Sequence, residues 1–269
     1  MKRFSVILCT FLFLLPLIAE GKTPSQIAII LDDVGGKPTD SVLFDLPKQI
    51  TFSILPNTQY STAFSHRAAQ QNREVMLHMP MEPIEEKSLG DGPLLANMYP
   101  NQMRQTLYAA LKTVPHAVGV NNHMGSKLTQ MSIPMQTVMT ALADNNLFFI
   151  DSVTTRNSMA SEMALVSGVR HARRHVFLDH LQTEAFIQQQ FASLIELARK
   201  RGKAIAIGHP YPITIEFLQA AIADLPDDIE VITVSQYLNE TNKFRINPML
   251  VRSPQDITSD TKAPETAPK

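Results

Sequence analysis

The chain has 269 residues, 24 of them basic and 25 acidic, so its formal net charge is −1 at pH 7. A nearly neutral protein creates no field that would hold it on nucleic acid or on anionic lipid, and both are disfavoured as partners. Cys9 is the only cysteine and lies in the N-terminal apolar segment, which excludes a disulfide or a thiolate nucleophile from the rest of the chain; any metal site there must use histidine and carboxylate ligands.

The first 21 residues have the pattern of a secretory signal peptide. Lys2-Arg3 precedes an apolar run from Phe4 to Ile18, and the small residues in Ala19-Glu20-Gly21 suit a cleavage site. The run is shorter than the roughly 20 residues that span a bilayer, which favours cleavage over the alternative of an uncleaved anchor. We therefore expect export across the inner membrane, a periplasmic location and no stable membrane anchor after cleavage.

Short apolar runs then alternate with longer amphipathic ones. The strand-like runs are 27–32, 51–55, 74–78, 117–121, 147–151, 175–178, 204–208 and 230–234. The helix-like segments are 60–72, 101–113, 132–145, 158–166, 183–201 and 213–223. Asn101, Ser132 and Thr183 are predicted to cap three of these helices.

This alternation favours parallel strands joined by crossover helices. The fold class is therefore α/β, and the number of strands and helices predicts a (β/α) barrel, complete or distorted, within one domain over residues 25–240. The Pro/Gly-rich stretch 80–100 is predicted to form a long loop over the site. Residues 243–269 are polar and Pro-rich and are predicted to be a disordered tail.

Ionisable side chains stand at the ends of five predicted strands. The carboxyl ends of parallel strands meet at one edge of the sheet, where α/β enzymes place their sites. Two histidines and a carboxylate are a common ligand set for a catalytic zinc ion, so the pattern predicts a metal-dependent hydrolase. The five segments are IAIILDDVG (27–35), EVMLHMPME (74–82), GVNNHMGS (119–126), LFFIDS (147–152) and AIAIGHP (204–210).

Asp32 and Asp33 are adjacent at the end of the first strand. Opposite pleat directions, or a turn that begins there, would let one carboxylate reach a metal ion and the other a water molecule. The alternative is that Asp32 caps the next element and Asp33 is a turn residue. The following Gly35-Gly36 is a weak signal for a phosphate-binding loop because no GK[ST] sequence follows.

His78 and His123 are the candidate histidine ligands. His78 precedes Met79-Pro80, where the proline is expected to end the strand. For His78 alone, a ligand and a buried structural residue are equally supported. His123 lies in the polar cluster 121–126, where Gly125 permits close approach of the backbone, and a ligand role is favoured. Asn122 and Ser126 in this cluster are candidates for binding or orienting substrate.

His209 opens His-Pro-Tyr-Pro, a sequence too rigid and polar for ordinary core. A histidine near its usual pKa can act as a general acid toward a leaving group. Asp151 with Ser152 could orient that histidine or the substrate, and helix capping is the equal alternative. Tyr211 is a further candidate for contact with substrate.

The three arginines and five histidines considered next are weaker candidates for the site. Arg156, Arg173 and Arg174 could contact an anionic intermediate or product, although a solvated surface position is the simpler expectation for each. Because few cationic residues cluster, a metal phosphoesterase is the weaker alternative enzyme. The remaining histidines are expected to be structural or superficial; they are His66, His116, His171, His175 and His180.

With ILDDVG, LHMPME, NHMGS, IDS and GHP in this order, the chain resembles the divergent polysaccharide deacetylase family. This family is a branch of the superfamily that contains chitin and peptidoglycan deacetylases, and the resemblance spans residues 25–240. It implies a distorted (β/α) barrel and a divalent metal ion, usually zinc, held by one Asp and two His. It also implies hydrolysis of N-acetyl groups on sugars, with a polysaccharide or peptidoglycan-like glycan as the partner.

The resemblance also implies individual roles. Asp33 resembles the metal-binding second Asp of the superfamily's Asp-Asp motif, and Asp32 resembles the general base that activates water. His209 resembles the late histidine that acts as general acid. His78 falls where the superfamily keeps a His-x-x-x-His pair, but position 82 is Glu, so His123 would complete the metal triad from the next strand.

Two superfamily motifs are therefore altered, because the Arg-Pro-Pro-Tyr segment is also replaced by residues 121–126. The favoured function is an exported deacetylase that removes N-acetyl or O-acetyl groups from an envelope or extracellular polysaccharide. The alternative is an inactive protein of the same fold that binds glycan or scaffolds envelope proteins.

Overall fold

The computed structural model describes residues 23–242, so the expected signal peptide and C-terminal tail lie outside the described residues. Within this range nine strands form one sheet. The strands are β1 (Ser25–Val34), β2 (Thr51–Ile54), β3 (Val75–Met81), β4 (Ala117–Met124), β5 (Phe148–Asp151), β6 (His171–Arg173), β7 (Val176–Phe177), β8 (Lys203–Gly208) and β9 (Ile229–Ile232).

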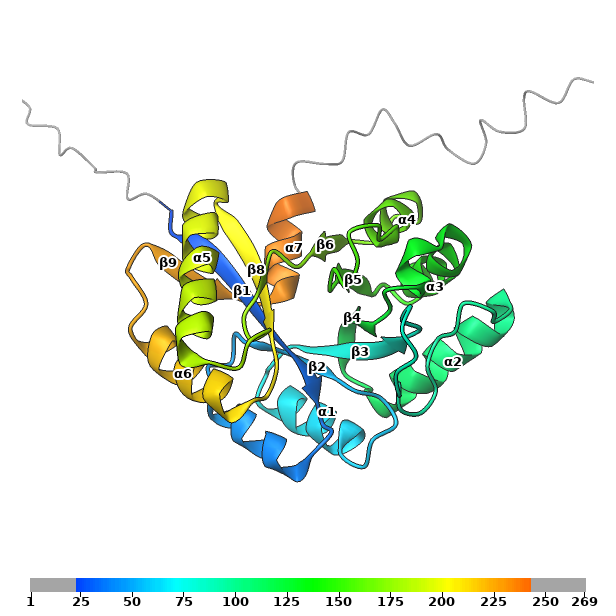
Figure 1. Ribbon diagram of the computed structural model, residues 1–269, viewed down its shortest axis with the longest axis horizontal. Coiled ribbons are helices and arrows are strands. Elements are labelled where there is room, and N and C mark those ends of the chain that lie inside the picture. Colours follow the sequence, from blue (N-terminus) through cyan, green and yellow to red (C-terminus); the bar gives the residue numbers. More distant parts are fainter. Residues whose placement is uncertain (1–22, 243–269) are drawn as a thin grey trace, which may run out of the picture.

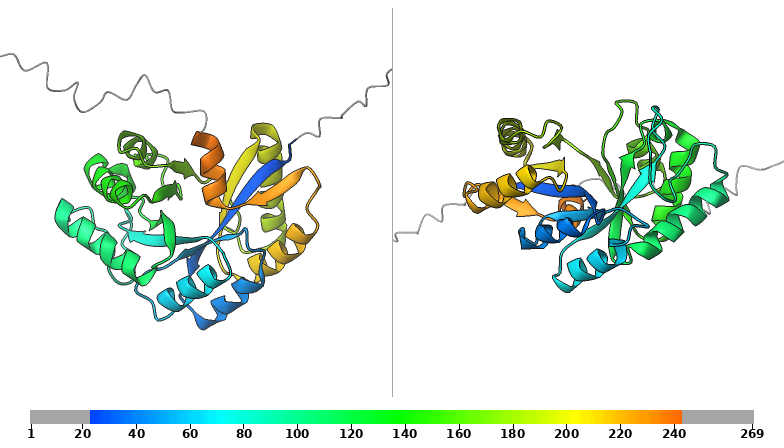
Figure 2. Two further views of the ribbon diagram at one scale, coloured as in Figure 1. Left: turned by 180° about the vertical axis from the view of Figure 1, so that it is seen from behind. Right: turned by 60° about the horizontal axis from the view of Figure 1, so that its bottom comes forward.

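Helices surround the curled sheet (Figures 1 and 2). Among those of residues 23–242, none combines the length and apolar character needed to cross a membrane. The helices are η1 (Pro38–Asp45), α1 (Ser61–Gln70), α2 (Pro100–Thr113), η2 (Leu128–Gln130), α3 (Ser132–Asp144), α4 (Ala160–Val166), α5 (Glu184–Arg201), α6 (Pro212–Ala223) and α7 (Val234–Asn242), where η marks a 3-10 helix.

All strand pairs are parallel, in the order β6-β5-β4-β3-β2-β1-β8-β7, and β9 also pairs with β1. Among the described strands, β6 and β7 are the two ends of this path and do not pair with each other. The barrel is therefore incomplete. This confirms the predicted fold class, an α/β protein with a distorted (β/α) barrel.

Both faces of the sheet are buried, which explains why the central strand β1 is apolar along most of its length. Ile27, Ile29 and Leu31 belong to the core between the sheet and the outer helices. Ala28 and Ile30 belong to a second core on the inner face, to which α7 contributes. Because side chains alternate along a strand, the even-numbered positions of β1 face the inside of the curl.

The helix α7 closes the amino end of this interior. Lys203, at the start of β8, donates to the carbonyl of Tyr237 over 2.8 Å, and the Ser235 amide lies 3.1 Å from a carboxylate oxygen of Glu74, just before β3. The opposite, carboxyl end of the strands is left for a site. The helix α7 was not predicted from the sequence, because the segment is mostly polar and contains only a few apolar residues.

The helices and strands that were predicted from the sequence are all present, with small shifts of their ends. The three-residue strand β6 was missed because His-Ala-Arg carries no apolar run. Pro80 does not end β3, contrary to the prediction. It pairs with His123 within the sheet, and its carbonyl accepts from the Leu94 amide over 2.8 Å, so the strand continues to Met81.

Only one of the three predicted helix caps is correct. The Thr183 hydroxyl accepts from the Phe186 amide over 3.3 Å at the start of α5. Asn101 lies inside α2, which begins at Pro100, because proline suits the first helical position. Ser132 begins α3, and no side-chain cap bond is present there.

We expect Leu238→Ala to lower the free energy of unfolding by about 2–5 kcal/mol, because it removes a fully buried side chain from the inner core. Urea denaturation would measure the change. Leu165→Ala is the matched control, since Leu165 is 66% exposed and its truncation should cost less than about 0.5 kcal/mol. Equal effects of the two substitutions would contradict the role given to α7.

Candidate metal and active site

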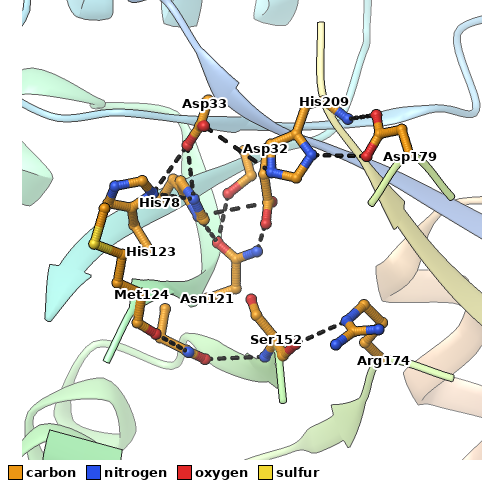
Figure 3. Close-up of polar contacts among 12 residues, drawn as sticks. Asp32, Asp33, His78, Asn121, His123, Met124, Ser152, Arg174, Asp179 and His209 are labelled. Carbon is orange, nitrogen blue, oxygen red and sulfur yellow. Dashed lines mark hydrogen bonds and ion pairs between the residues drawn. The ribbon is translucent and has the colours of Figure 1, made fainter. Parts of the chain in front are cut away.

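The end of β1 brings two carboxylates to the inner face of the sheet. Asp32 occupies an even-numbered position of β1, so its side chain points inward, whereas the side chain of Asp33 would point outward if the strand were regular. The pairing of β1 with β2 shifts between Leu31 and Val34, and Asp33 has a left-handed φ of 58°. Such an irregularity re-aims side chains next to active sites. Both carboxylates therefore approach His78, with closest distances of 3.6 Å from Asp32 and 3.1 Å from Asp33 (Figure 3).

Asp33, His78 and His123 form a compact triangle of potential metal ligands. Asp33 Oδ1 lies 3.1 Å from His78 Nε2 and 3.0 Å from His123 Nδ1, and these two nitrogens are 3.1 Å apart (Figure 3). Ligand atoms at about 2.0 Å from a tetrahedral zinc ion are separated by about 3.3 Å. The three atoms thus have nearly the spacing that one such ion requires.

The chemistry of Asp33 also fits a cation. Its Oδ1 is buried and makes no hydrogen bond of acceptable geometry within the described chain, although two imidazole nitrogens lie beside it. A buried carboxylate oxygen without a partner is costly. A divalent ion bound by Asp33, His78 and His123 would remove that cost.

Asn121 connects the ligand triangle with Asp32. This fully buried amide on β4 places its Oδ1 2.7 Å from His78 Nδ1, and its Nδ2 donates to Asp32 Oδ1 over 2.7 Å. The Ser53 hydroxyl also donates to Asn121 Oδ1, over 2.6 Å. Because an amide oxygen only accepts, the neutral form of His78 keeps its proton on Nδ1 and presents the Nε2 lone pair to the triangle. Asn121 was not among the residues selected from the sequence.

The two aspartates differ in proton affinity. Burial raises the pKa of Asp32, although the nearby His78 acts in the opposite direction. Burial also opposes ionisation of Asp33, but its contacts with His123 and His78 outweigh burial and hold the pKa of Asp33 well below its usual value. Environments that separate the pKa values of neighbouring carboxyls are typical of acid–base sites. Asp33 suits a permanent anion, and Asp32 suits a proton acceptor.

His209 is held by Asp179, which was not predicted. Asp179 Oδ1 lies 2.9 Å from His209 Nδ1, and its Oδ2 accepts from the His209 amide over 2.6 Å and from the Thr214 hydroxyl over 2.9 Å. Burial would lower the pKa of His209, but Asp179 outweighs this effect and raises it. With Nδ1 bound to the carboxylate, Nε2 is directed to the site and lies 4.0 Å from Asp33 Oδ2. Asp179 directly follows the predicted strand 175–178, so the strand-end rule would have found it.

The contacts of Asp151 are with Val153 and Arg173, and not with His209, which was one of the two partners considered for it. Its Oδ1 accepts from the Val153 amide over 2.8 Å, and Arg173 Nε lies 3.3 Å from its Oδ2. Val153 has a φ of 54°, a rare conformation for a β-branched residue, and the bond to Asp151 stabilises this turn. Asp151 therefore stabilises a turn, and it does not cap a helix, because the next helix, α4, begins at Ala160 and has no side-chain cap bond.

Asn122, Ser126 and Ser152 support the backbone around the site. Asn122 Oδ1 accepts from the Ser152 amide over 2.9 Å, and its Nδ2 donates to the carbonyl of Met124 over 2.7 Å. The Ser126 hydroxyl accepts from the Ile84 amide over 3.0 Å. These contacts hold the loops around the site, and Asn122 and Ser152 also line the hollow beside the triangle.

Glu82 occupies the place of the superfamily's second histidine, but it takes no part in the triangle. Its carboxylate pairs with Lys127 and accepts from the Ala96 amide over 2.6 Å. These contacts tie the loop after β3 to the segment after β4. His123 completes the triangle from the neighbouring strand instead, as the sequence led us to expect.

Two hollows flank the triangle and share His123, His209 and Tyr211. The first, of about 770 Å³, includes apolar side chains such as Leu55 and Ile215. The second, of about 720 Å³, includes Asp32 and more polar side chains. The Tyr211 ring stands 5.5 Å from that of His209, between the hollows. A site open on two sides can accommodate an extended ligand.

An incomplete parallel barrel with an Asp-His-His triangle at its carboxyl edge has the architecture of metal-dependent (β/α)-barrel hydrolases. The chain belongs to the divergent polysaccharide deacetylase family, which it matches over residues 29–238. This confirms the family predicted from the sequence.

The chain is also similar to uncharacterized bacterial proteins and to a solved structure. It is 40% identical over 216 residues to the uncharacterized protein YibQ of Escherichia coli (strain K12), covering 80% of this chain and 68% of that protein. It is 42% identical over 209 residues to an uncharacterized protein of Haemophilus influenzae (strain ATCC 51907 / DSM 11121 / KW20 / Rd), covering 77% and 75% of the two chains. The crystal structure of the uncharacterized protein ATU2773 from Agrobacterium tumefaciens C58 has a TM-score of 0.77 at 22% identity over 81% of this chain and 90% of that one, so the fold is shared.

We expect the protein to retain about one zinc ion per chain after loading and dialysis, and His123→Ala to lose it, because three protein ligands are needed to hold a catalytic zinc ion. Elemental analysis would measure the zinc content. His66→Ala is the matched control, because His66 is exposed and lies outside the triangle. Full zinc retention by His123→Ala would exclude His123 as a ligand.

Metal affinity is expected to rise with pH. Without metal, burial favours a neutral His78 ring, but Asp32 and Asp33 outweigh it and raise the pKa of His78 to about 9. A ligand histidine must be neutral, so below pH 9 zinc binding would displace a proton from His78, and each lower pH would weaken binding. Calorimetric titration in buffers of different ionisation enthalpy would count the proton released. Affinity independent of pH between 6.5 and 9 would contradict this linkage.

Proposed function

We propose that the protein is an exported metal-dependent hydrolase that removes N-acetyl, or O-acetyl, groups from an envelope or extracellular polysaccharide. The observation that carries the proposal is the ligand triangle with Asp32 on one side and the His209–Asp179 pair on the other. Membership of the divergent polysaccharide deacetylase family supports the substrate class. The signal-peptide pattern of residues 1–21 supports export to the periplasm.

Asp33, His78 and His123 would hold the metal ion, for which we propose zinc because two imidazoles and one carboxylate suit it. Such an ion, when bound, supplies a Lewis acid that acidifies water and polarises an acetyl carbonyl. Each hollow is lined by two of the three ligand residues, Asp33 and His123 in the first and His78 and His123 in the second, so an acetyl group on a glycan could reach the triangle from either side.

Asp32 would act as the general base. Asn121 fixes one of its oxygens, and burial raises the pKa of the carboxyl, which increases its tendency to take a proton from the attacking water. The water oxygen then bonds to the acetyl carbon as its proton passes to Asp32. Asp33, one residue along, would remain ionised and would be one of the residues that hold the cation.

His209 would act as the general acid. Asp179 binds its Nδ1 and favours the protonated ring, so Nε2 can give a proton to the sugar nitrogen as the carbon–nitrogen bond breaks. The products are acetate and a free amine. The His209–Asp179 pair orients the acid much as a carboxylate orients the histidine of a hydrolytic triad.

We expect Asp32→Asn and His209→Gln each to lower kcat by about 10²–10⁴-fold, because each removes one proton-transfer group. Both variants should keep the zinc content of the wild type, because neither residue belongs to the triangle. Acetate release from acetylated chito-oligosaccharides and from peptidoglycan would measure turnover.

Asp91→Asn provides a control for loss of an exposed carboxylate. Undiminished turnover in Asp32→Asn would rule out its role as base. If the zinc-loaded wild type bound these glycans but released no acetate, the inactive glycan-binding protein would replace the deacetylase as the best description.

A further inference from the structure

The second hollow beside the triangle contains a fixed arginine. Arg174 follows β6, and its Nε donates to the Ser152 carbonyl over 2.8 Å while Nη2 donates to the Val153 carbonyl over 3.1 Å. Its guanidinium carbon also lies 4.7 Å from the centre of the Phe177 ring. Two backbone contacts and one aromatic face hold this side chain in a single orientation at the wall of the hollow (Figure 3).

The charge of Arg174 has no close counter-ion. Within residues 23–242 no carboxylate lies within ion-pair distance of its guanidinium, and Nη1 donates to no described residue. The charges of Asp32 and Asp151 act on Arg174 from a distance without contacting it, because Asp32 accepts from Asn121 and the Asp151 carboxylate lies 3.3 Å from Arg173. A half-buried cation without a counter-ion in contact is costly, and an anionic ligand would offset this cost.

Other side chains of this hollow fit the same kind of ligand. Lys87, on the loop after β3, and His180, after β7, also line it. Its two carboxylates, Asp32 and Asp179, are both committed to hydrogen bonds within the site. Lys87 already pairs with Glu85 over 3.0 Å, so Arg174 is the permanent cation of this lining, within the described residues, that has no carboxylate in contact with it.

We propose that this hollow binds a carboxylate of the substrate, so that the preferred substrate is an acidic acetylated glycan, with a carboxylate-bearing sugar beside the acetylated unit. The proposal rests on the deacetylase function proposed above and narrows its substrate class. The planar guanidinium of Arg174 offers paired N–H donors that match a carboxylate, whereas a neutral polymer would leave it unpaired. The carboxylate could belong to a uronic acid or to a lactyl ether on an amino sugar, and the experiment separates these sources.

The test compares acetate release by the zinc-loaded protein from three sets of oligosaccharides matched in length. One set is neutral chito-oligosaccharide, one alternates N-acetylated amino sugar units with uronic acid units, and one is peptide-free peptidoglycan glycan with its lactyl carboxylates free or amidated. We expect the wild type to prefer one of the carboxylate-bearing sets, and amidation to abolish a preference for the lactyl set.

We expect Arg174→Gln to lower kcat/KM for the preferred acidic substrate by about tenfold or more, and for the neutral one by less than about threefold, because only the former loses a charge-assisted pair. Arg174→Lys should restore part of the preference. Lys87→Gln gives a second test at an exposed loop position, where the fold cannot be at issue, with a smaller loss confined to acidic substrates. Arg156→Gln, an exposed arginine outside the hollow, is the matched control.

Equal losses on neutral and acidic substrates in Arg174→Gln would overturn the proposal, because they would mean that Arg174 acts only on Asp32 or on the turn at Val153. If the wild type released acetate from none of the substrates, the proposed deacetylase function would fail separately. Calorimetric binding of the same glycans would then decide: a preference for the carboxylate form that Arg174→Gln loses would support the anion site, and equal binding would overturn it.

Discussion

The site depends on one departure from regular strand geometry, the left-handed backbone of Asp33 at the end of β1. Alternation along this strand sends Ala28, Ile30 and Asp32 to the inside of the barrel and would send Asp33 toward the outer helices. The irregular pairing with β2 turns the second carboxylate inward and places it against two imidazoles. The strained residue and the buried carboxylate both cost free energy, and a bound cation would offset that cost.

The fold places the packing contacts and the chemical groups at opposite ends of the barrel. The inner face of the barrel is apolar at its amino end, where α7 closes it, and polar at its carboxyl end, where the site lies. Asn121 orients His78 and Asp32 together, and Asp179 orients His209. These buried supporting groups determine which nitrogen of each ring faces the site, and this makes the ligand triangle and the acid–base pair specific.

In the proposal made above, the hollow next to the triangle would add a constraint on substrate that the triangle lacks. Groups that bind a metal ion or move protons act on any acetyl group that reaches them. A rigid cation held by the carbonyls of Ser152 and Val153 can instead discriminate among glycans by their charge. The sequence allowed Arg174 a contact with an anionic group but favoured a solvated surface position, whereas the structure places it half-buried at the wall of the hollow.

Sequence alone determined the strand–helix alternation, the fold class and most of the polar residues at strand ends, because these depend on local periodicity and on the common direction of parallel strands. Only the tertiary structure decided which strand ends meet. Asp179 follows β7, and because β7 pairs with β8, Asp179 reaches His209 at the end of β8. Asp151 ends β5, which lies on the opposite side of β1 in the strand order. The strand order, and the contacts that follow from it, depend on pairing between segments that are far apart in the chain. The residue pattern within one segment does not specify which other segment it pairs with.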